Sequence, residues 1–279
     1  MAVIGYPKNH FCFETNLYIC LLLIINHYKM KKLLLFTILT SFAFSTYAQR
    51  NANAEYWNSF HYKAKEGKEQ KFLDAAAKKT KMFNSEADNI IVTYRITTGD
   101  NSGVYERLMP YQTSKNYDLD KSKELKYWSE NVAPFATPVG GQQIWRRMQW
   151  ADANIKPDGA PFKYLSKTTY LIKPSHRDVF QVWVERIGKV FAKRRPDSAR
   201  VVFRLESGGQ GNTYVSYFGY NKFEHNNPKQ DLTWEQEYNE MFGAGSWDVD
   251  LKSFNDSKEM IVGEIRENLE LVPELLPNN

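Results

Sequence analysis

The feature that most constrains the fold of this chain is an internal repeat. At a constant offset of 109 positions, YRITTGDNSGVYERLMPY (94–111) lies over FRLESGGQGNTYVSYFGY (203–220). Upstream, the match continues at an offset of 108, from Tyr62 over Tyr170 to Phe83 over Phe191. A fixed period of this kind indicates repeated structural units. The sequence therefore predicts two halves with the same fold, each a little over ~100 residues long.

Each half predicts the same order of elements. An aromatic and β-branched segment, 56–63 or 164–172, is typical of a strand, and an amphipathic helix follows it. In the second half the helix is expected to begin with a capping box at Ser175 and Asp178. Two alternating runs joined by a polar turn then indicate a β-hairpin. Helical stretches at 120–132 and 233–242 come next, and a strand is expected at 143–150. The segment 264–272 is interpreted as a strand, because Pro273 would end a helix there, and the end of a helix from Asp256 is the alternative.

The Gly-Gly-Gln sequence at 208–210 stands at the tip of the second hairpin. It resembles the peptide-releasing loop of translation release factors, but its repeat counterpart is the ordinary turn Gly99-Asp-Asn-Ser. Glycines at such a tip supply the positive φ angles of a tight turn. We interpret it as a turn.

An export signal is expected near the N-terminus. Met30-Lys31-Lys32, the apolar run LLLFTILTSFAF and the small residues before Gln49 have the three parts of a signal peptide. Residues 1–29 are then interpreted as a misannotated upstream extension, residues 30–48 as the signal peptide, 49–160 as the first repeat and 161–279 as the second. The alternative is a membrane anchor within 11–44, but no uninterrupted apolar run there approaches the ~20 residues that a bilayer requires.

Processing would change the composition. Of the 37 basic and 32 acidic residues, four lysines and one glutamate lie in residues 1–48, which leaves 33 and 31. Both cysteines, Cys12 and Cys20, lie there too, so the mature part would have neither a disulfide nor a thiolate nucleophile. A nearly neutral exported chain predicts no nucleic-acid partner and no membrane span after cleavage, and a periplasmic or secreted location.

The predicted element order is that of the ferredoxin-like split βαβ. In its element order, its tandem copies and its Tyr/Phe-rich strands, the chain resembles the dimeric α/β-barrel superfamily, which includes the antibiotic-biosynthesis monooxygenases. The resemblance implies an α+β protein in which two tandem ferredoxin-like repeats pack as an intramolecular α/β barrel. Members include cofactor-free oxygenases, haem enzymes, isomerases and binding proteins, with the ligand between the sheet and its helices or inside the barrel.

Two arginines at the same repeat position, Arg95 and Arg204, are candidate ligand-binding residues. In a partly apolar cavity they would hold a carboxylate or phenolate by charge-assisted hydrogen bonds. The alternative is that each pairs with an acid such as Glu106 or Glu206. Four repeated tyrosines form an aromatic stripe in each hairpin, either as core or as ligand-orienting hydroxyls. They are Tyr105, Tyr214, Tyr111 and Tyr220.

Three histidines remain after residue 48: His61, His176 and His225. His61 alternates with aromatic residues in the first strand, and its repeat counterpart is Thr169, so it is the weak catalytic candidate; chance divergence would produce the same asymmetry. No metal-ligand spacing is present, and no cofactor is predicted. Haem stays open, because haem relatives in the resembled superfamily use one axial histidine.

The leading functional hypothesis is noncovalent binding of a small amphipathic or aromatic molecule by an exported bacterial monomer or homodimer. One alternative is a cofactor-independent monooxygenase-like enzyme that uses His61, Arg95 and Arg204. A second is a structural or interaction protein of the cell envelope, with its cavity packed shut.

Overall fold

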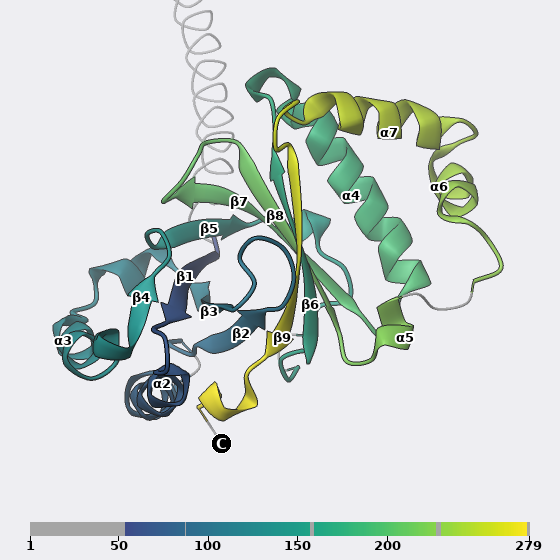
Figure 1. Ribbon diagram of the computed structural model, residues 1–279. Coiled ribbons are helices and arrows are strands. Elements are labelled where there is room, and N and C mark those ends of the chain that lie inside the picture. Colours follow the sequence, from purple (N-terminus) through teal and green to yellow (C-terminus); the bar gives the residue numbers. More distant parts are fainter. Residues whose placement is uncertain (1–53, 87, 157–158, 227–229, 278–279) are drawn as a thin grey trace, which may run out of the picture. The chain divides into compact units, whose positions relative to one another are not determined.

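The computed structural model describes residues 54–86, 88–156, 159–226 and 230–277 (Figure 1). The expected signal peptide and the segment before it lie outside this part of the chain. The described residues form a mixed α+β fold. Its strands are β1 (Tyr56–Ala64), β2 (Val92–Ile96), β3 (Val104–Gln112), β4 (Ala136–Pro138), β5 (Gln143–Arg147), β6 (Tyr164–Leu171), β7 (Ala199–Ser207), β8 (Thr213–Tyr220) and β9 (Glu264–Leu271). Its helices are α2 (Glu69–Phe83), α3 (Ser122–Asn131), α4 (Arg177–Arg194), α5 (Phe223–Asn226), α6 (Trp234–Phe242) and α7 (Ser246–Ser257).

Eight strands form a closed antiparallel barrel. Hydrogen-bonded neighbours run in the order β3, β2, β9, β6, β8, β7, β5 and β1, and β1 pairs again with β3 to close the ring. The short β4 pairs with the end of β1 outside that ring. Closure gives each of the eight strands a partner on both sides, so no long edge is left open to another chain.

The two halves of the chain have the same strand order. The neighbours are β2, β3, β1 and β5 in the first half, and β7, β8, β6 and β9 in the second. The hairpins also share a register, with Tyr94 opposite Glu106 and Phe203 opposite Val215. The halves join where β2 meets β9 and where β5 meets β7. Aligned positions of the sequence repeat therefore occupy equivalent places in the sheet.

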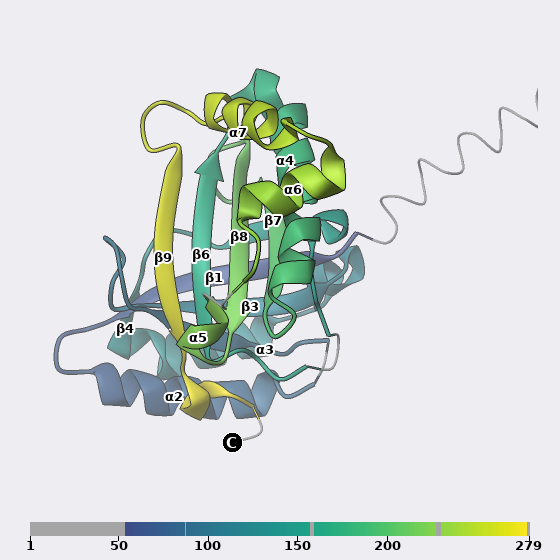
Figure 2. The ribbon, with the colours of Figure 1, turned by 90° about the vertical axis from the view of Figure 1, so that its right-hand side faces the viewer.

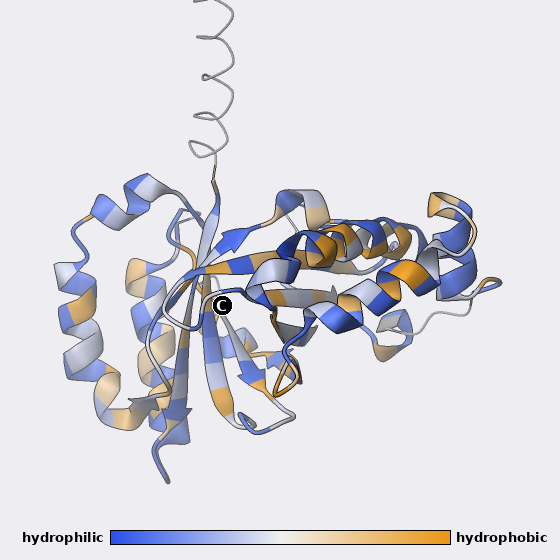
Figure 3. Cartoon of the chain, turned by 90° about the horizontal axis from the view of Figure 1, so that it is seen from above, coloured by the Kyte–Doolittle hydropathy of each residue, from blue (hydrophilic) through white to orange (hydrophobic). Residues whose placement is uncertain are grey.

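Helices cover the outside of the strands in two groups. Seen from above, α2 and α3 lie on one side of the barrel, and α4, α6 and α7 lie on the other (Figures 1 and 3). Beneath the first group, Phe72 packs between Tyr62 and Tyr105, and beneath the second, Phe180 packs between Tyr170 and Tyr214. Each amphipathic helix thus buries its apolar face against the outer face of its own half.

The barrel interior is a packed core. One cluster of buried residues has members from β2, β3 and β5 to β9, and Trp57 of β1 packs against it. Since all eight strands contribute, this cluster lies inside the ring. Its members alternate along the strands with residues that face the helices, as Tyr94 and Ile96 do on either side of Arg95. Side chains therefore fill the space that a barrel-centred ligand would need.

Most predicted elements are present, but the strand expected at 143–150 ends at Arg147 and the short helix α5 was missed. The expected capping box at Ser175 is wrong, because a 3₁₀ turn over Pro174–His176 precedes α4 and α4 has no side-chain cap. The helix α7 was missed, and it directly precedes β9, whose strand assignment is confirmed. The strand β4 was missed because it is only three residues long. Within the described ranges, no helix is both long and apolar enough to cross a bilayer.

Candidate functional site

The two candidate arginines lie on the outer face of the barrel, which the helices cover, and not in the packed interior. Arg95 is half-exposed, and its Nη2 lies 3.6 Å from Oε1 of Glu69 on α2. Arg204 is about one-third exposed, and its Nη2 lies 3.2 Å from Oε2 of Glu206. Strand alternation explains this placement, since the residues that flank both arginines fill the interior. Both arginines pair with acids, which is the alternative that the sequence left open.

The four candidate tyrosines do not converge on one pocket. Tyr105 and Tyr214 pack under α2 and α4, and the Tyr105 hydroxyl donates to Oε1 of Glu69 at 2.5 Å. Tyr111 adopts a left-handed backbone, with φ of 58°, and its ring lies 5.8 Å from that of Trp57. Tyr220 is buried at the opposite end of the second hairpin from Tyr214. The roles of these four tyrosines in ligand binding stay predictions.

His61 faces the barrel interior. It lies directly opposite Glu106 on β3, and its Nε2 is 3.4 Å from Oε1 of that carboxylate. Only 14% of the His61 side chain is exposed, against 1% for Glu106. A carboxylate beside an imidazole can fix the ring orientation and stabilise its protonated form. His61 is therefore placed for acid–base chemistry at the edge of a packed core.

Glu106 is the centre of an interior cluster that we define as His61, Glu106, Lys167, Tyr217 and Glu267. Lys167 Nζ lies 3.0 Å from Glu106 Oε2 and 3.5 Å from Glu267 Oε2, and the Tyr217 hydroxyl donates to Glu106 Oε1 at 2.5 Å. Burial by itself would raise the pKa of Glu106, but Lys167 and His61 lower it below its usual range. Burial raises the pKa of Tyr217, and the Glu106 carboxylate raises it further. The cluster therefore holds the Glu106 carboxylate in its ionised form beside one buried lysine.

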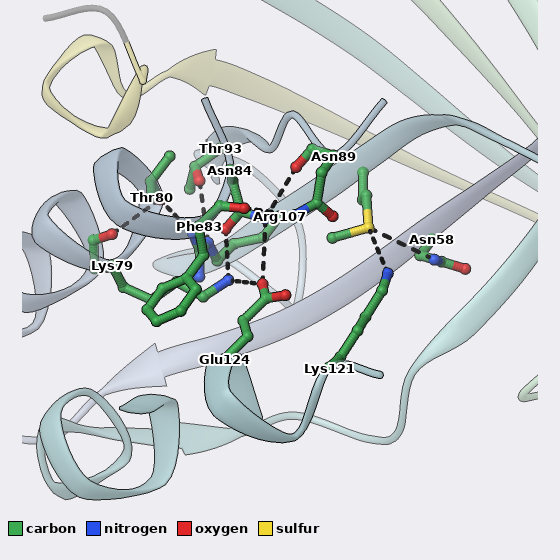
Figure 4. Close-up of polar contacts among 12 residues, drawn as sticks. Asn58, Lys79, Thr80, Phe83, Asn84, Asn89, Thr93, Arg107, Lys121 and Glu124 are labelled. Atoms are coloured by element: carbon green, nitrogen blue, oxygen red, sulfur yellow. Dashed lines mark hydrogen bonds and ion pairs between the residues drawn. The ribbon is translucent and has the colours of Figure 1, made fainter. Parts of the chain in front are cut away.

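A second group lies between the outer face of β3 and the helices α2 and α3 (Figure 4). We call it the helix-side cluster and define it as Lys79, Asn84, Arg107, Glu124 and Trp128. Lys79 Nζ donates to Asn84 Oδ1 at 2.6 Å and forms an ion pair with Glu124. Asn84 Nδ2 donates to Glu124 Oε1 at 3.2 Å. Asn84 therefore links the lysine of α2 to the carboxylate of α3.

Arg107 of β3 is the most deeply buried cation of this cluster, with 2% of the residue exposed. Its Nη2 donates to Thr80 Oγ1 at 2.7 Å, its Nε donates to Thr93 Oγ1 at 3.3 Å, and the guanidinium lies 5.0 Å from the Trp128 ring. No carboxylate of the described residues lies within 4.0 Å of it. Burial lowers the pKa of Arg107 to about 10, so the charge is held without a direct counter-ion.

Lys79 shares this positive environment. Burial first, and then repulsion from Arg107, lower its pKa to about 8, although Glu124 opposes the decrease. Lys79 and Arg107 together carry two positive charges near neutral pH, against one negative charge on Glu124. The helix-side cluster thus has a surplus of positive charge beside the rings of Trp128 and Tyr62, whose centroids are 4.7 Å apart. This combination of charge and aromatic surface is suited to an organic anion.

The corresponding place in the second half is different. Ser216 occupies the repeat position of Arg107, and a hollow of about 340 Å³ lies there on the outer face of β9, β6 and β8. Hydroxyl and amide side chains dominate its lining, with Phe218 and Arg266 beside them. In the first half, the long Arg107 side chain fills this position on the outer face of the sheet. In the second half, the position remains open because Ser216 is short.

The described residues do not fit a haem or metal site. None of the three histidines lines that hollow or a second one of about 490 Å³ near Lys173. His61 is engaged with Glu106 in the packed interior, and His225 Nε2 lies 4.0 Å from Glu224. Over the described ranges, no group of three or more His, Cys, Asp or Glu side chains could hold a metal ion. The proposals below use no cofactor.

Sequence reasoning missed both clusters for different reasons. Glu106 was considered only as a partner of Arg95. Strand alternation separates the residues on the two faces of a strand, but it does not show which face will point into the barrel. Lys79 and Arg107 lie far apart in sequence and are brought together by the packing of α2 on β3. One signal was available: Arg107 breaks the repeat, since an arginine stands where the other half has Ser216.

Comparison with solved structures shows the fold of this chain. One similar structure is a "putative monooxygenase" from Lactobacillus acidophilus NCFM, with a TM-score of 0.53, 11% identity, and coverage of 78% of this chain and 94% of that one. Another is a "putative monooxygenase" from Fusobacterium nucleatum, with a TM-score of 0.52, 12% identity and coverage of 78% and 92%. The sequence matches no protein-family model and no curated protein. The structural likeness shows the fold alone, a mixed α+β protein with a closed antiparallel barrel.

Proposed function

We propose that this protein binds a small aromatic or amphipathic anion, a carboxylate or phenolate, at the helix-side cluster. The observation that carries the proposal is the buried guanidinium of Arg107, which has no carboxylate within 4.0 Å among the described residues. An unpaired buried charge is costly, and proteins normally pair such a group or use it. A bound anion would supply the missing counter-charge.

The helix α3 is suited to act as the cover of this site. None of its residues is buried, and Leu125 is 66% exposed. Its contacts with the rest of the fold include the Glu124 ion pair with Lys79 and the Trp128 ring against Tyr62. A small displacement of α3 would move Trp128 away from Arg107 and from the edge of the core cluster beneath α2, and leave the barrel interior in place.

The chemistry of binding follows from the cluster. The ligand carboxylate would accept hydrogen bonds from Arg107 and compete with Glu124 for Lys79. Its ring would pack against Trp128 or Tyr62, which offer apolar faces next to the cations. Added negative charge near Lys79 would raise the pKa of that lysine, so binding near pH 8 should be accompanied by proton uptake.

A fluorescence titration with 1-naphthoate tests the proposal, with the uncharged 1-naphthamide as the ligand control. Arg107→Gln should weaken naphthoate binding roughly 10- to 100-fold, because a charge-assisted hydrogen bond contributes about 1.5–3 kcal/mol. Arg204→Gln is the matched control, since that arginine is exposed and paired with Glu206. Equal binding of acid and amide, or equal affinity of the two variants, would contradict the proposal.

An acid–base enzyme, such as a cofactor-independent monooxygenase, is the second candidate. The 3.4 Å approach of His61 Nε2 to Glu106 Oε1 supports it. In that function Glu106 would orient His61, which would take a proton from a substrate at the barrel end. Oxygen consumption with anthrone and no added cofactor, abolished in His61→Gln, is the result expected of this candidate. Oxygen consumption that persists in that variant would remove His61 from the reaction.

Two further proposals concern the origin and the location of the chain. We propose that its halves arose by duplication of a ferredoxin-like unit; the shared strand order and hairpin register support this. We also propose export, with cleavage before Gln49; N-terminal sequencing of the protein from the periplasm of an expressing bacterium tests it. A purely structural role in the envelope remains the alternative that a failure of all ligand tests would favour.

A further inference from the structure

An exposed apolar loop joins α7 to β9, well away from the helix-side cluster. Met260, Ile261 and Val262 are 93%, 82% and 63% exposed, and they are consecutive. Single exposed apolar residues are common on protein surfaces, but three adjacent ones at a loop tip require an explanation. Figure 2 shows this loop extending past the edge of the sheet between α7 and β9.

The backbone holds this loop in a fixed shape. Glu259 N donates to Leu171 O at 2.9 Å, and Leu171 N donates to Gly263 O at 3.1 Å, so the tip is clamped on both sides. Val262 has a φ of 54°, which is rare and unfavourable for a β-branched residue. A Cβ atom on Gly263 would lie 2.2 Å from Glu259 O, so the turn requires glycine there. The three apolar side chains are therefore presented by a preformed tip.

A hollow of about 490 Å³ lies directly behind the tip and carries charges of both signs. Lys173 Nζ donates to the backbone carbonyl of Asp256 at 2.7 Å, and it has no ion-pair partner among the described residues. The Glu259 carboxylate likewise has no ion-pair partner in the described part of the chain. Lys258 and Glu264 also line the hollow, and they form an ion pair with each other, with Nζ 2.8 Å from Oε2. Lys173 and Glu259 thus have no ion-pair partner within 4.0 Å among the described residues, although the Asp256 carboxylate, which pairs with Lys252, also lines the hollow and interacts electrostatically with Lys173.

From this juxtaposition we infer that the loop docks on a lipid bilayer, with Met260 to Val262 inserted and a zwitterionic phospholipid headgroup in the hollow. The headgroup phosphate would lie against Lys173 and its ammonium group against Glu259. A protein partner fits less well, because a stable protein interface uses roughly 20–30 residues a side and this tip has three. Membrane binding strength scales with the buried apolar area, so insertion of this small tip predicts weak and reversible binding.

A site-specific label distinguishes insertion at this loop from any binding by the apolar N-terminal segment. The chain would carry Cys12→Ser and Cys20→Ser, and a single Ile261→Cys would bear a solvatochromic fluorophore. The matched control is Met241→Cys, which replaces a 43% exposed methionine on α6. Vesicles of phosphatidylethanolamine and phosphatidylcholine should move the emission of the label at 261 to shorter wavelength and leave the label at 241 unchanged. No change at 261, or equal changes at both positions, would overturn the inference.

Two variants test the apolar tip and the headgroup separately. Met260→Asp should raise the lipid concentration at half-maximal shift at least tenfold. Glu259→Gln should raise it at least threefold on phosphatidylethanolamine vesicles and leave it unchanged on phosphatidylglycerol vesicles, which lack the ammonium group. An equal effect on both lipids would refute the headgroup assignment. Saturable binding of soluble glycerophosphoethanolamine without any shift at 261 on vesicles would show a free-ligand site and overturn membrane docking.

Discussion

If Arg107 serves a ligand and not the apo fold, as we propose, it should contribute little to stability although it is buried. The decrease of its pKa from 12.5 to about 10 corresponds to a cost of about 3 kcal/mol for holding the charge in the folded state near pH 7. Its bonds to Thr80 and Thr93 offset about 1 kcal/mol each, and its contact with Trp128 offsets a similar amount. Arg107→Met should therefore change the free energy of unfolding by less than about 1.5 kcal/mol.

Arg194 is the matched comparison, because it is also buried, at 7% exposed against 2% for Arg107, but is paired with a carboxylate. Its Nη1 lies 2.8 Å from Glu237 Oε2, and its guanidinium lies 5.0 Å from Trp234. Removing one partner of a buried ion pair costs about 3–5 kcal/mol of stability. Arg194→Met should cost about 3 kcal/mol, because Lys193, 3.4 Å from Glu237, would still pair with that carboxylate. Urea unfolding followed by circular dichroism measures both variants. If Arg107→Met loses as much stability as Arg194→Met, Arg107 is a structural residue and the reasoning fails.

Three other perturbations test the electrostatics and the turns. Glu106 has a folded pKa below the unfolded value of 4.5. Its contribution to stability is therefore present above about pH 4.5 and is lost as the pH falls. In urea unfolding at several pH values, Glu106→Gln should lose less stability than the wild type as the pH is lowered. Lys79, with a folded pKa of about 8 against 10.5, should make the protein more stable as the pH rises between those values, and Lys79→Met should remove this increase in the same assay. Gly208→Ala should destabilise the protein by about 2 kcal/mol or more, since the new Cβ would lie 2.1 Å from Gln142 O. Gly103→Ala, where no atom lies within 4 Å of the new Cβ, should cost only about 1 kcal/mol. Thermal unfolding measures both.

The sequence predicted the course of the chain well because hydrophobic period and repeat register report on local structure. The alternation around Arg95 and Arg204 correctly separated the two faces of each strand. It could not show that the face without the arginines would close into a packed interior, so the cavity was left open between the barrel interior and the space between sheet and helices. The hairpin-tip assignment of Gly208 is confirmed, with φ of 91°, because turn chemistry is also local.

The candidate sites were less predictable because they depend on packing between distant segments. Lys79 and Glu124 are separated by 45 positions, and Glu106 and Lys167 by 61. Neither pair has a sequence motif, and each of these residues alone is typical of a solvated surface. Their burial follows from barrel closure and from the packing of α2 and α3, which no single segment encodes.

Native mass spectrometry of the protein purified from the bacterial periplasm without refolding tests the anion-binding account most directly. The account predicts a reproducible bound mass on the wild-type chain and on Arg204→Gln, and its loss from Arg107→Gln. The released compound should carry a carboxylate or phenolate. A bound mass that Arg107→Gln retains, or a wild-type chain that is free of ligand and also fails to bind 1-naphthoate, would contradict it.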